Sequence, residues 1–507
     1  MGNKSSSSSI SNEDLLKLEN AKNNLDKSAL AAELPSFIAS LEGRVLTPSD
    51  TEPYMEARTR PFNQDMRGFP ILIVQARTSS DVSKTVNFVR DFGGGIGFCV
   101  CCGGHSNRCM NTDAVVLDLQ YMNNVSVNTE DKLVHIGGGA YLEEVDTALG
   151  PVGFGTVYGT YPYTGVGGLV LAGGYGWLAR LYGLSVDNLV EIEIVLADGR
   201  IVVANDGNDF SRVLLGCRGG GGNFGVVTRF TMRIYKLPTY CYGGNKVFLS
   251  PTLKSAVEVC VKCDQIVQDM PNRTSSIIVL PAGAPVVPTM WVTLTDDKLD
   301  QVEELRAASN CGGWVKVSDT MKALSLHNDV QRMTMENIVS GFVYTSLIQV
   351  GSNDTPLPTP LFEELLTHTR KTKSKKIDAA VVLLFRMGGV VATGTELQTT
   401  INPSTRRARY FAILESRWTA AAGDAGRDAS RQWVKDAYSI LSKYRCGPQM
   451  KHGPLDVVEG CVDELKLTDV AAHDLGYDDH AIQLLGQIKT EFDPNNFFRN
   501  NLNVLPK

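Results

Sequence analysis

Three glycine-rich stretches constrain the fold of this 507-residue chain more than any other feature of its sequence. They cover residues 100–106 (Val-Cys-Cys-Gly-Gly-His-Ser), 164–178 and 218–228. Glycine loses more backbone entropy on folding than other residues, so glycines set among apolar residues are costly in ordinary helices and strands. Clustered in this way, they indicate backbone that packs closely against something flat or bulky, such as a large cofactor.

The first stretch has the clearest local structure. It follows a short apolar run, 96–100, that predicts a strand, and it then turns through two glycines to present His105. Successive backbone N–H groups in such a turn can bind an anion, for example a pyrophosphate. The alternative is a plain strand-to-loop turn with a surface histidine. None of the three stretches matches the Rossmann G-x-G-x-x-G fingerprint that opens a βαβ unit, or a P-loop with its Lys-Ser/Thr.

All three stretches, in this order and spacing, resemble those of the berberine-bridge-enzyme-like flavoproteins, which have a PCMH-type FAD-binding domain. The resemblance is close over residues 70–235 and returns at 492–499 (Phe-Asp-Pro-Asn-Asn-Phe-Phe-Arg). It implies an α+β fold, in which N- and C-terminal segments form a two-part FAD-binding domain around an inserted substrate domain of antiparallel sheet and helices. The expected parts are a flexible tail (1–30), the FAD-binding domain (31–240), the substrate domain (241–445) and the returning segment (446–507).

The resemblance also implies how FAD is held. In this family the first stretch wraps the FAD pyrophosphate and its histidine bonds to the flavin 8α-methyl group, a role that carries to His105. Doubly linked relatives have a cysteine in place of Tyr161, so one covalent bond is expected here. Thr164 stands where relatives control the access of oxygen. The expected cofactor-binding residues are Val100, Cys101, Cys102, Gly103, Gly104, His105, Ser106, Thr164, Gly165, Gly168, Gly173, Gly174, Gly176, Gly225, Val226 and Val227.

The cysteines need separate interpretation. Cys101 and Cys102 stand where relatives often carry Arg-Gly or Gly-Gly, and small filler residues are the favoured interpretation. A reactive thiol is the alternative, if the site lowers the thiol pKa. The eleven cysteines do not suggest a disulfide framework, so reduced thiols are expected. Cys260 and Cys263 have C-x-x-C spacing, but no second cysteine or histidine pair is near, which argues against zinc.

A flavin oxidase needs a base within hydrogen-bonding reach of the substrate's hydroxyl or amine proton. The candidates are Tyr477, Glu415, Tyr163 and Tyr161. Tyr477 roughly aligns with a tyrosine that the resemblance implicates as base, although the asparagine and arginine of that motif are missing here. Tyr161 and Tyr163 are candidates for substrate contact; the alternative is two half-buried aromatic residues lining a β-turn.

Glu415 lies three residues before Trp418 on a predicted strand. Some relatives place an acid or amide five residues before this tryptophan, and the period of two puts Glu415 on the same face of the strand. Burial would raise the pKa of such a carboxyl group. The alternative interpretation is a surface acid paired with Arg417 or Arg409.

Local patterns predict further elements on both sides of these stretches. Strands are expected at 71–75, 115–119, 189–196, 201–204, 226–235, 276–280, 289–294, 342–350, 379–386 and 409–414. Helices are expected at 80–92, 141–149, 253–267, 299–308, 361–369 and 482–492.

Composition limits the partners. The net charge of −6 argues against nucleic acid, and no apolar run of about 18 residues predicts a transmembrane helix. The N-terminus lacks the apolar core of a signal peptide, so a cytoplasmic location is expected. Gly2 and Ser6 satisfy the myristoylation pattern, but a solvated tail is the favoured interpretation. One acyl chain would give only weak, reversible membrane contact.

The leading hypothesis is an FAD-dependent oxidase with the flavin bonded to His105. It would oxidise an alcohol, hemiacetal or amine in a small metabolite and reduce O2 to H2O2. One alternative is a flavin dehydrogenase with poor oxygen reactivity. The other is a flavin-loaded, non-catalytic binding protein, which the incomplete C-terminal motif suggests.

Overall fold

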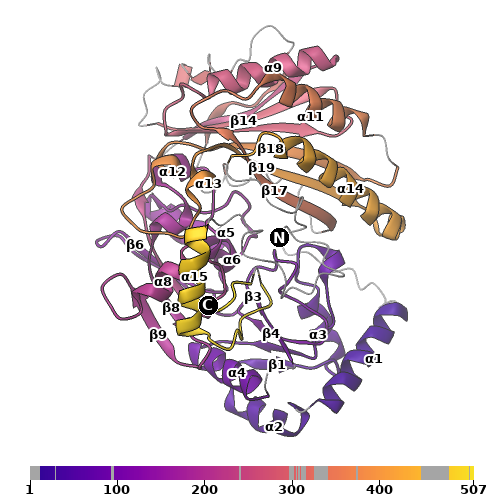
Figure 1. Cartoon of the computed structure of the whole chain (residues 1–507), viewed down its shortest axis with the longest axis vertical. Coiled ribbons are helices and arrows are strands. Elements are labelled where there is room, and N and C mark those ends of the chain that lie inside the picture. The colour runs from indigo at the N-terminus through magenta and orange to yellow at the C-terminus, as the bar shows by residue number, and fades with distance from the viewer. Residues whose placement is uncertain are drawn as a thin grey trace.

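The chain folds into two stacked halves (Figure 1). The two-segment half combines residues 12–238 with 479–507, and the inserted half covers 241–446. This computed structural model describes residues 12–28, 30–92, 96–238, 241–295, 302, 303, 305, 306, 309, 316–324, 330, 341–372, 375–446, 479–501 and 503–507.

The first sheet of the two-segment half delivers the His105 loop. Its strands, in the order β1-β2-β4-β3, are β1 (Arg44–Leu46), β2 (Leu72–Gln75), β4 (Ala114–Asp118) and β3 (Gly97–Cys101). β2, β4 and β3 are parallel, and α4 (Ser79–Asp91) makes the crossover from β2 to β3. A capping box at Thr78 and Asp81 starts this helix, which confirms the helix predicted at 80–92, and Val82, Val86 and Val89 are buried on one face of it.

A second, antiparallel sheet completes this half. Its order is β5 (Val125–Asn128), β6 (Leu133–Gly137), β10 (Val226–Arg233), β8 (Leu189–Val195) and β9 (Ile201–Asn205). The strands predicted at 189–196 and 201–204 are confirmed and pair as the β8–β9 hairpin, with Gly199 at φ +85° in its turn. Around it lie α5 (Leu142–Leu149), η2 (Gly150–Val152), β7 (Phe154–Gly155), α6 (Val166–Leu171), α7 (Ala179–Tyr182), η3 (Ser185–Asn188), α8 (Ser211–Cys217) and β11 (Tyr235–Lys236).

The N-terminal segment packs against the first sheet. It forms α1 (Asn12–Lys27), α2 (Leu30–Ser40), α3 (Thr51–Arg58) and η1 (Gln64–Met66). The tail expected over 1–30 is therefore helical over Asn12–Lys27. Leu18, Ala21 and Leu25 are buried because their spacing of three and four places them on one helix face. Gly2 and Ser6 lie outside the described residues.

The inserted half is an antiparallel sheet with helices, as expected. The strand order is β15 (Lys316–Asp319), β12 (Cys241–Leu249), β14 (Val286–Leu294), β13 (Thr274–Pro281), β18 (Ala379–Arg386), β19 (Ala408–Trp418) and β17 (Phe342–Ser352), with β16 (Lys322–Leu324) also paired to β12. The helices are α9 (Leu253–Ile266), α11 (Thr359–Lys371), α12 (Val390–Thr393), α13 (Pro403–Arg406), η5 (Ala420–Ala422) and α14 (Gly423–Ser442). α9, α11 and α14 cover the outer face of the sheet around Trp291, Phe362 and Trp433 (Figure 1).

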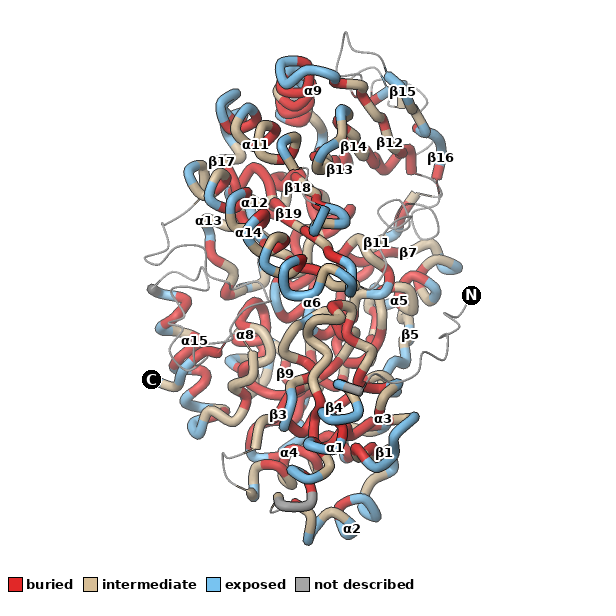
Figure 2. The backbone as a smooth tube through the Cα atoms, turned by 90° about the vertical axis from the view of Figure 1, so that its right-hand side faces the viewer, coloured by how far each residue is buried: buried red, intermediate tan, exposed pale blue. Residues whose placement is uncertain are grey.

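The inner face of this sheet is turned toward the two-segment half. Along β19, Phe411, Ile413, Glu415 and Arg417 are only partly buried, whereas the residues between them are buried. Phe411 and Ile413 pack against the cluster of buried residues that includes Trp177 from the second glycine-rich stretch. Because Glu415 alternates with the buried residues in the same way as Phe411 and Ile413, it lies on the inner face. In the molecule as a whole, buried residues follow the strands and the sides of the helices that pack on them (Figure 2).

The C-terminal segment returns to the two-segment half through α15 (Asp479–Phe492), which lies beside α8 (Figure 1). Within it, Lys489 and Asp493 form an ion pair of 2.6 Å between Nζ and Oδ2, with both side chains fully buried. The ammonium group also donates to the carbonyl oxygens of Asn223 (2.7 Å) and Phe498 (3.0 Å). This pair fixes α15 to the third glycine-rich stretch.

Replacing Lys489 with methionine should strongly destabilise the two-segment half. The change leaves the Asp493 carboxylate buried without its cation, and breaking a buried pair costs about 3–5 kcal/mol. The check is the midpoint of chemical unfolding. Lys17→Met is the control, because Lys17 pairs with Glu13 on the surface and its loss should leave the midpoint unchanged. An unchanged midpoint for Lys489→Met would contradict a stabilising role for the buried Lys489–Asp493 pair.

Candidate active site

The backbones of the first and second glycine-rich stretches touch each other beside His105. A Cβ atom on Gly103 would lie 2.2 Å from the Gly165 nitrogen, so neither position tolerates a side chain without a shift. Gly104 has φ +73°, and a Cβ there would lie 3.1 Å from the Arg60 carbonyl oxygen. This close approach explains why the loop after β3 turns through two glycines.

The other predicted cofactor-binding glycines differ in how much space surrounds them. Gly174, Gly176 and Gly225 serve internal packing, because a Cβ would lie 2.1 Å from Ser185 Oγ, 1.8 Å from the Tyr158 carbonyl oxygen and 2.5 Å from the Val195 carbonyl oxygen, respectively. Gly173 has φ +120°, and its Cβ would lie 3.3 Å from Ile401. At Gly168, by contrast, a Cβ would meet nothing within 4 Å.

The apolar residues predicted to bind the cofactor are mostly core residues. Cys101, Val226 and Val227 are buried in hydrophobic clusters, and Val100 is partly buried against one of them. Their main-chain atoms are therefore what they can offer to a ligand. Ser106 is exposed at the end of the loop.

Aromatic rings enclose the imidazole of His105. The Phe62 ring stacks on it with a centroid distance of 4.9 Å and an interplanar angle of 14°. Tyr161 meets it edge-on at 5.4 Å, and Tyr163 in turn contacts Tyr161 at 5.9 Å. His105 Nε2 lies 3.1 Å from the Tyr163 carbonyl oxygen. The turn that holds both tyrosines closes with a 3.0 Å bond from the Thr164 nitrogen to the Tyr161 carbonyl oxygen.

Burial controls the protonation of the loop. It lowers the pKa of His105 to about 4, with the hydrogen bond to Tyr163 opposing the shift, so the imidazole is neutral at pH 7. Burial raises the pKa of Cys102 to about 11, which argues against the reactive-thiolate alternative for that residue. Burial also raises the pKa of Tyr161; the positive charge of Arg417 opposes this shift and Glu415 adds to it.

The inner face of the inserted sheet contributes charged groups to the same place. Arg417 Nε lies 2.7 Å from Glu415 Oε1, and the Arg417 guanidinium carbon lies 5.6 Å from the centre of the Phe62 ring. The pairing of Glu415 with Arg417 is one that the sequence suggested. Both side chains are mostly buried, so Glu415 is not a surface acid. Arg409 instead pairs with Asp264 in the protein interior.

The structure thus brings three of the four predicted catalytic residues to one site. Tyr161, Tyr163 and Glu415 lie around His105, whereas Tyr477 lies outside the described residues. Phe62 and Arg417 also belong to this site. No local pattern in the sequence pointed to Phe62, whereas Arg417 was named as a pairing partner of Glu415 and lies on the same face of β19, two positions along.

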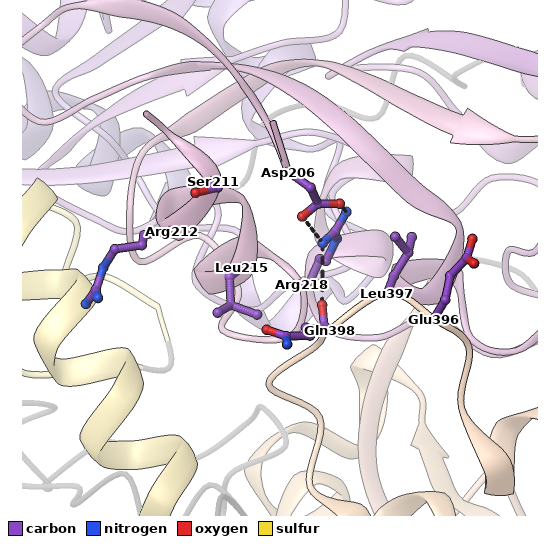
Figure 3. A pocket seen from close by; sticks show the side chains of 8 residues that line it. All are labelled: Asp206, Ser211, Arg212, Leu215, Arg218, Glu396, Leu397 and Gln398. Atoms are coloured by element: carbon purple, nitrogen blue, oxygen red, sulfur yellow. Dashed lines mark hydrogen bonds and ion pairs between the residues drawn. The ribbon is translucent and has the colours of Figure 1, made fainter. Parts of the chain in front are cut away.

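A separate pocket of about 500 Å³ lies where the two halves meet at α8 (Figure 3). Its lining residues are Asp206, Ser211, Arg212, Leu215, Arg218, Glu396, Leu397 and Gln398. Buried Arg218 makes a two-bond ion pair with Asp206 at 2.7 and 2.8 Å. The pocket contains none of the residues that the sequence predicted as functional.

Other expectations concern metals, thiols and membranes. Within the described segments, no group of three or more His, Cys, Asp or Glu residues could hold a metal ion. Cys263 is disulfide-bonded, which departs from the expectation of reduced thiols, whereas Cys260 is free and buried. Over the same segments, no helix combines the length and apolar character needed to cross a bilayer.

Two family models match the chain, both in the two-segment half. The model described as "FAD binding domain" matches residues 70–205, and the one described as "Berberine and berberine like" matches residues 481–505. An FAD-linked oxidoreductase of Dictyostelium discoideum is 27% identical over 474 residues, covering 93% of this chain and 96% of that protein. The (R)-6-hydroxynicotine oxidase of Paenarthrobacter nicotinovorans is 31% identical over 207 residues, covering 40% of this chain and 44% of the oxidase.

Solved structures share the architecture. 6-Hydroxy-D-nicotine oxidase from Arthrobacter nicotinovorans superposes with a TM-score of 0.79 at 23% identity, covering 92% of this chain and 99% of that one. Berberine bridge enzyme from Eschscholzia californica gives a TM-score of 0.79 at 18% identity, covering 94% and 99%. The family models, the relatives and the fold agree that the chain carries the FAD-binding and berberine-like domains found in FAD-linked oxidoreductases of the berberine-bridge-enzyme-like, PCMH type.

Proposed function

We propose that this protein is an oxidase whose FAD is bonded through the flavin 8α-carbon to His105. Its substrate is a small metabolite with an alcohol, hemiacetal or amine group, and O2 is the electron acceptor. The observation that carries the proposal is the contact chain from His105 to Phe62, Arg417 and Glu415, since it joins the imidazole to an acid on the inner face of the inserted sheet.

The residues present fit FAD. The backbones of Gly103 and Gly165 meet without side chains, while Gly168 and Gly222 have open space where a Cβ would stand. The Tyr163 carbonyl oxygen can only accept a hydrogen bond, so Nε2 of His105 carries the hydrogen and Nδ1 carries the lone pair. A neutral imidazole with a free lone pair is the nucleophile that a covalent link to FAD needs.

The residues around His105 divide the catalytic work. When bound, the flavin supplies the chemistry of accepting a hydride from the substrate carbon and returning electrons to O2. Glu415 takes the proton from the substrate's hydroxyl or amine group. Arg417 holds the Glu415 carboxylate in place through its 2.7 Å bond. Burial raises the pKa of Tyr161, so its hydroxyl group stays protonated and can donate a hydrogen bond to the substrate.

The test is acid precipitation of the purified protein. A yellow pellet, with flavin that stays on the polypeptide and on the peptide containing His105 after digestion, is the expected result. A colourless pellet with all flavin in the supernatant would refute the covalent link. Hydrogen peroxide formed in proportion to substrate would support the oxidase, and an amine, alcohol and sugar panel would identify the substrate class.

The second candidate function is a dehydrogenase that reacts slowly with oxygen. One substituted variant of berberine bridge enzyme is named a reticuline dehydrogenase. In this chain, Thr164, which follows Tyr163 directly, is the residue proposed to control the access of oxygen to the flavin. Stopped-flow reoxidation of the photoreduced protein separates the two functions, because an oxidase turns yellow again quickly in air-saturated buffer. The relatives are oxidoreductases by name, which disfavours the non-catalytic alternative.

A further inference from the structure

We propose that Phe62 is a positioning residue for the covalent attachment of FAD, and that the segment 60–64 fixes its ring against His105. This inference rests on the proposed covalent link. It concerns a residue that lies 43 positions before the histidine and outside all three glycine-rich stretches.

Main-chain contacts tie the segment to the His105 loop. The Phe62 nitrogen donates to the Gly104 carbonyl oxygen at 2.8 Å. Arg60 donates to the Cys102 carbonyl oxygen at 2.8 Å and forms an ion pair with the fully buried Asp118 at the end of β4. The segment thus holds the loop on both sides of Gly103.

The same segment is anchored to the inserted half. Two main-chain hydrogen bonds join the segment to Gly341. The Gly341 nitrogen donates to the Phe62 carbonyl oxygen (3.2 Å), and the Gln64 nitrogen donates to the Gly341 carbonyl oxygen (2.9 Å). The Asn63 side-chain amide donates to the Val343 carbonyl oxygen at 2.8 Å and is buried. The stacked ring is therefore held from two directions, by the loop and by β17.

The stacking geometry selects one orientation of the imidazole. Phe62 covers one face at an angle of 14°, Tyr161 packs edge-on, and the Tyr163 carbonyl oxygen binds Nε2. Together these contacts stop rotation of the ring and leave Nδ1 as the nitrogen with a lone pair. A nucleophile held in its reactive orientation reacts faster, because less orientational entropy is lost on the way to the transition state.

The bond that forms joins Nδ1 to the 8α-carbon of the flavin. One C–H hydrogen of the methyl group and the Nε2 hydrogen leave as protons. The two electrons pass through the flavin to O2, which is reduced to H2O2. Phe62 takes no part in the electron balance; it orients the ring that makes the bond.

The test compares rates of covalent attachment after FAD is added to full-length protein produced under riboflavin limitation. Phe62→Leu removes the aromatic face, and Phe62→Tyr keeps it. Phe88→Leu is the matched control, because Phe88 stacks on Phe37 at 3.9 Å in the same half, in a pair that includes neither His105 nor its loop. Flavin retained by gel filtration reports binding, and flavin in the acid pellet reports the bond.

We expect Phe62→Leu to bind FAD but to attach it about tenfold more slowly than the wild type. Phe62→Tyr and Phe88→Leu should keep wild-type rates. Phe62→Met and Phe62→Trp are measured alongside, so that one poorly folding variant does not decide the result. Attachment rates that follow melting temperature instead of aromatic character, or a wild-type rate for Phe62→Leu, would overturn the inference. A colourless wild-type pellet would instead overturn the proposed function itself.

Discussion

Replacing His105 with alanine is expected to remove all covalently bound flavin while leaving the protein folded. The alanine keeps the backbone of the loop between Gly104 and Ser106, so the contact of Gly103 with Gly165 is preserved. Only the imidazole that would carry the flavin is lost. The measurement is the ratio of acid-stable flavin to protein, which should fall from near one in the wild type to zero in the variant.

His368→Ala is the matched control for this change. His368 lies on α11, bonds the Trp433 carbonyl oxygen at 3.1 Å and has no place in the site, so the flavin ratio should stay at the wild-type value. Acid-stable flavin in His105→Ala would mean that another side chain carries the link. The pH dependence adds a second check. Burial lowers the pKa of His105 to about 4, so attachment should stay fast from pH 8 to about 5 and slow only as the pH approaches that value.

Replacing Glu415 with glutamine is expected to lower the rate of substrate oxidation by about 10²–10⁴-fold, the contribution typical of a general base. The amide keeps the size of the side chain and can still accept the bond from Arg417, but it takes no proton from the substrate. The measurement is anaerobic bleaching of the bound flavin by substrate in a single turnover, which isolates the step in which the base acts.

Two controls make this result interpretable. Glu364→Gln, which changes a surface acid paired with Lys443, should leave the bleaching rate unchanged. The flavin content and absorption spectrum of Glu415→Gln should match the wild type, so that a slow rate is not a loss of cofactor. A rate within about threefold of the wild type would remove Glu415 as the base and leave Tyr161 and Tyr163 as the candidates at His105.

Much of the fold follows from local sequence. Apolar periodicity and a capping box define α4, alternation with an Asp-Gly turn defines the β8–β9 hairpin, and the period of two places Glu415 on the inner face of β19. These signals are readable because each depends on neighbours within one helical turn or one hairpin. The glycine-rich stretches likewise indicate close backbone packing wherever they occur.

The features that could not be predicted from the sequence depend on contacts between residues far apart in the chain. Nothing near Phe62 in the sequence shows that it stacks on His105, because that contact arises only when the segment 60–64 is fixed between the loop and β17. The burial of α1 was missed for a related reason. Its mean composition is polar, and among its described side chains the buried hydrophobic ones are Leu18, Ala21 and Leu25 on one face.

The return of the last residues to the first half has a consequence for biosynthesis. Val504 donates to the Asn223 side chain at 2.9 Å, and Lys489 reaches the same residue through its carbonyl oxygen. A ribosome makes Asn223 and Val504 281 positions apart, so the inserted sheet can form first, whereas these contacts around Asn223 close only once the returning segment has been made.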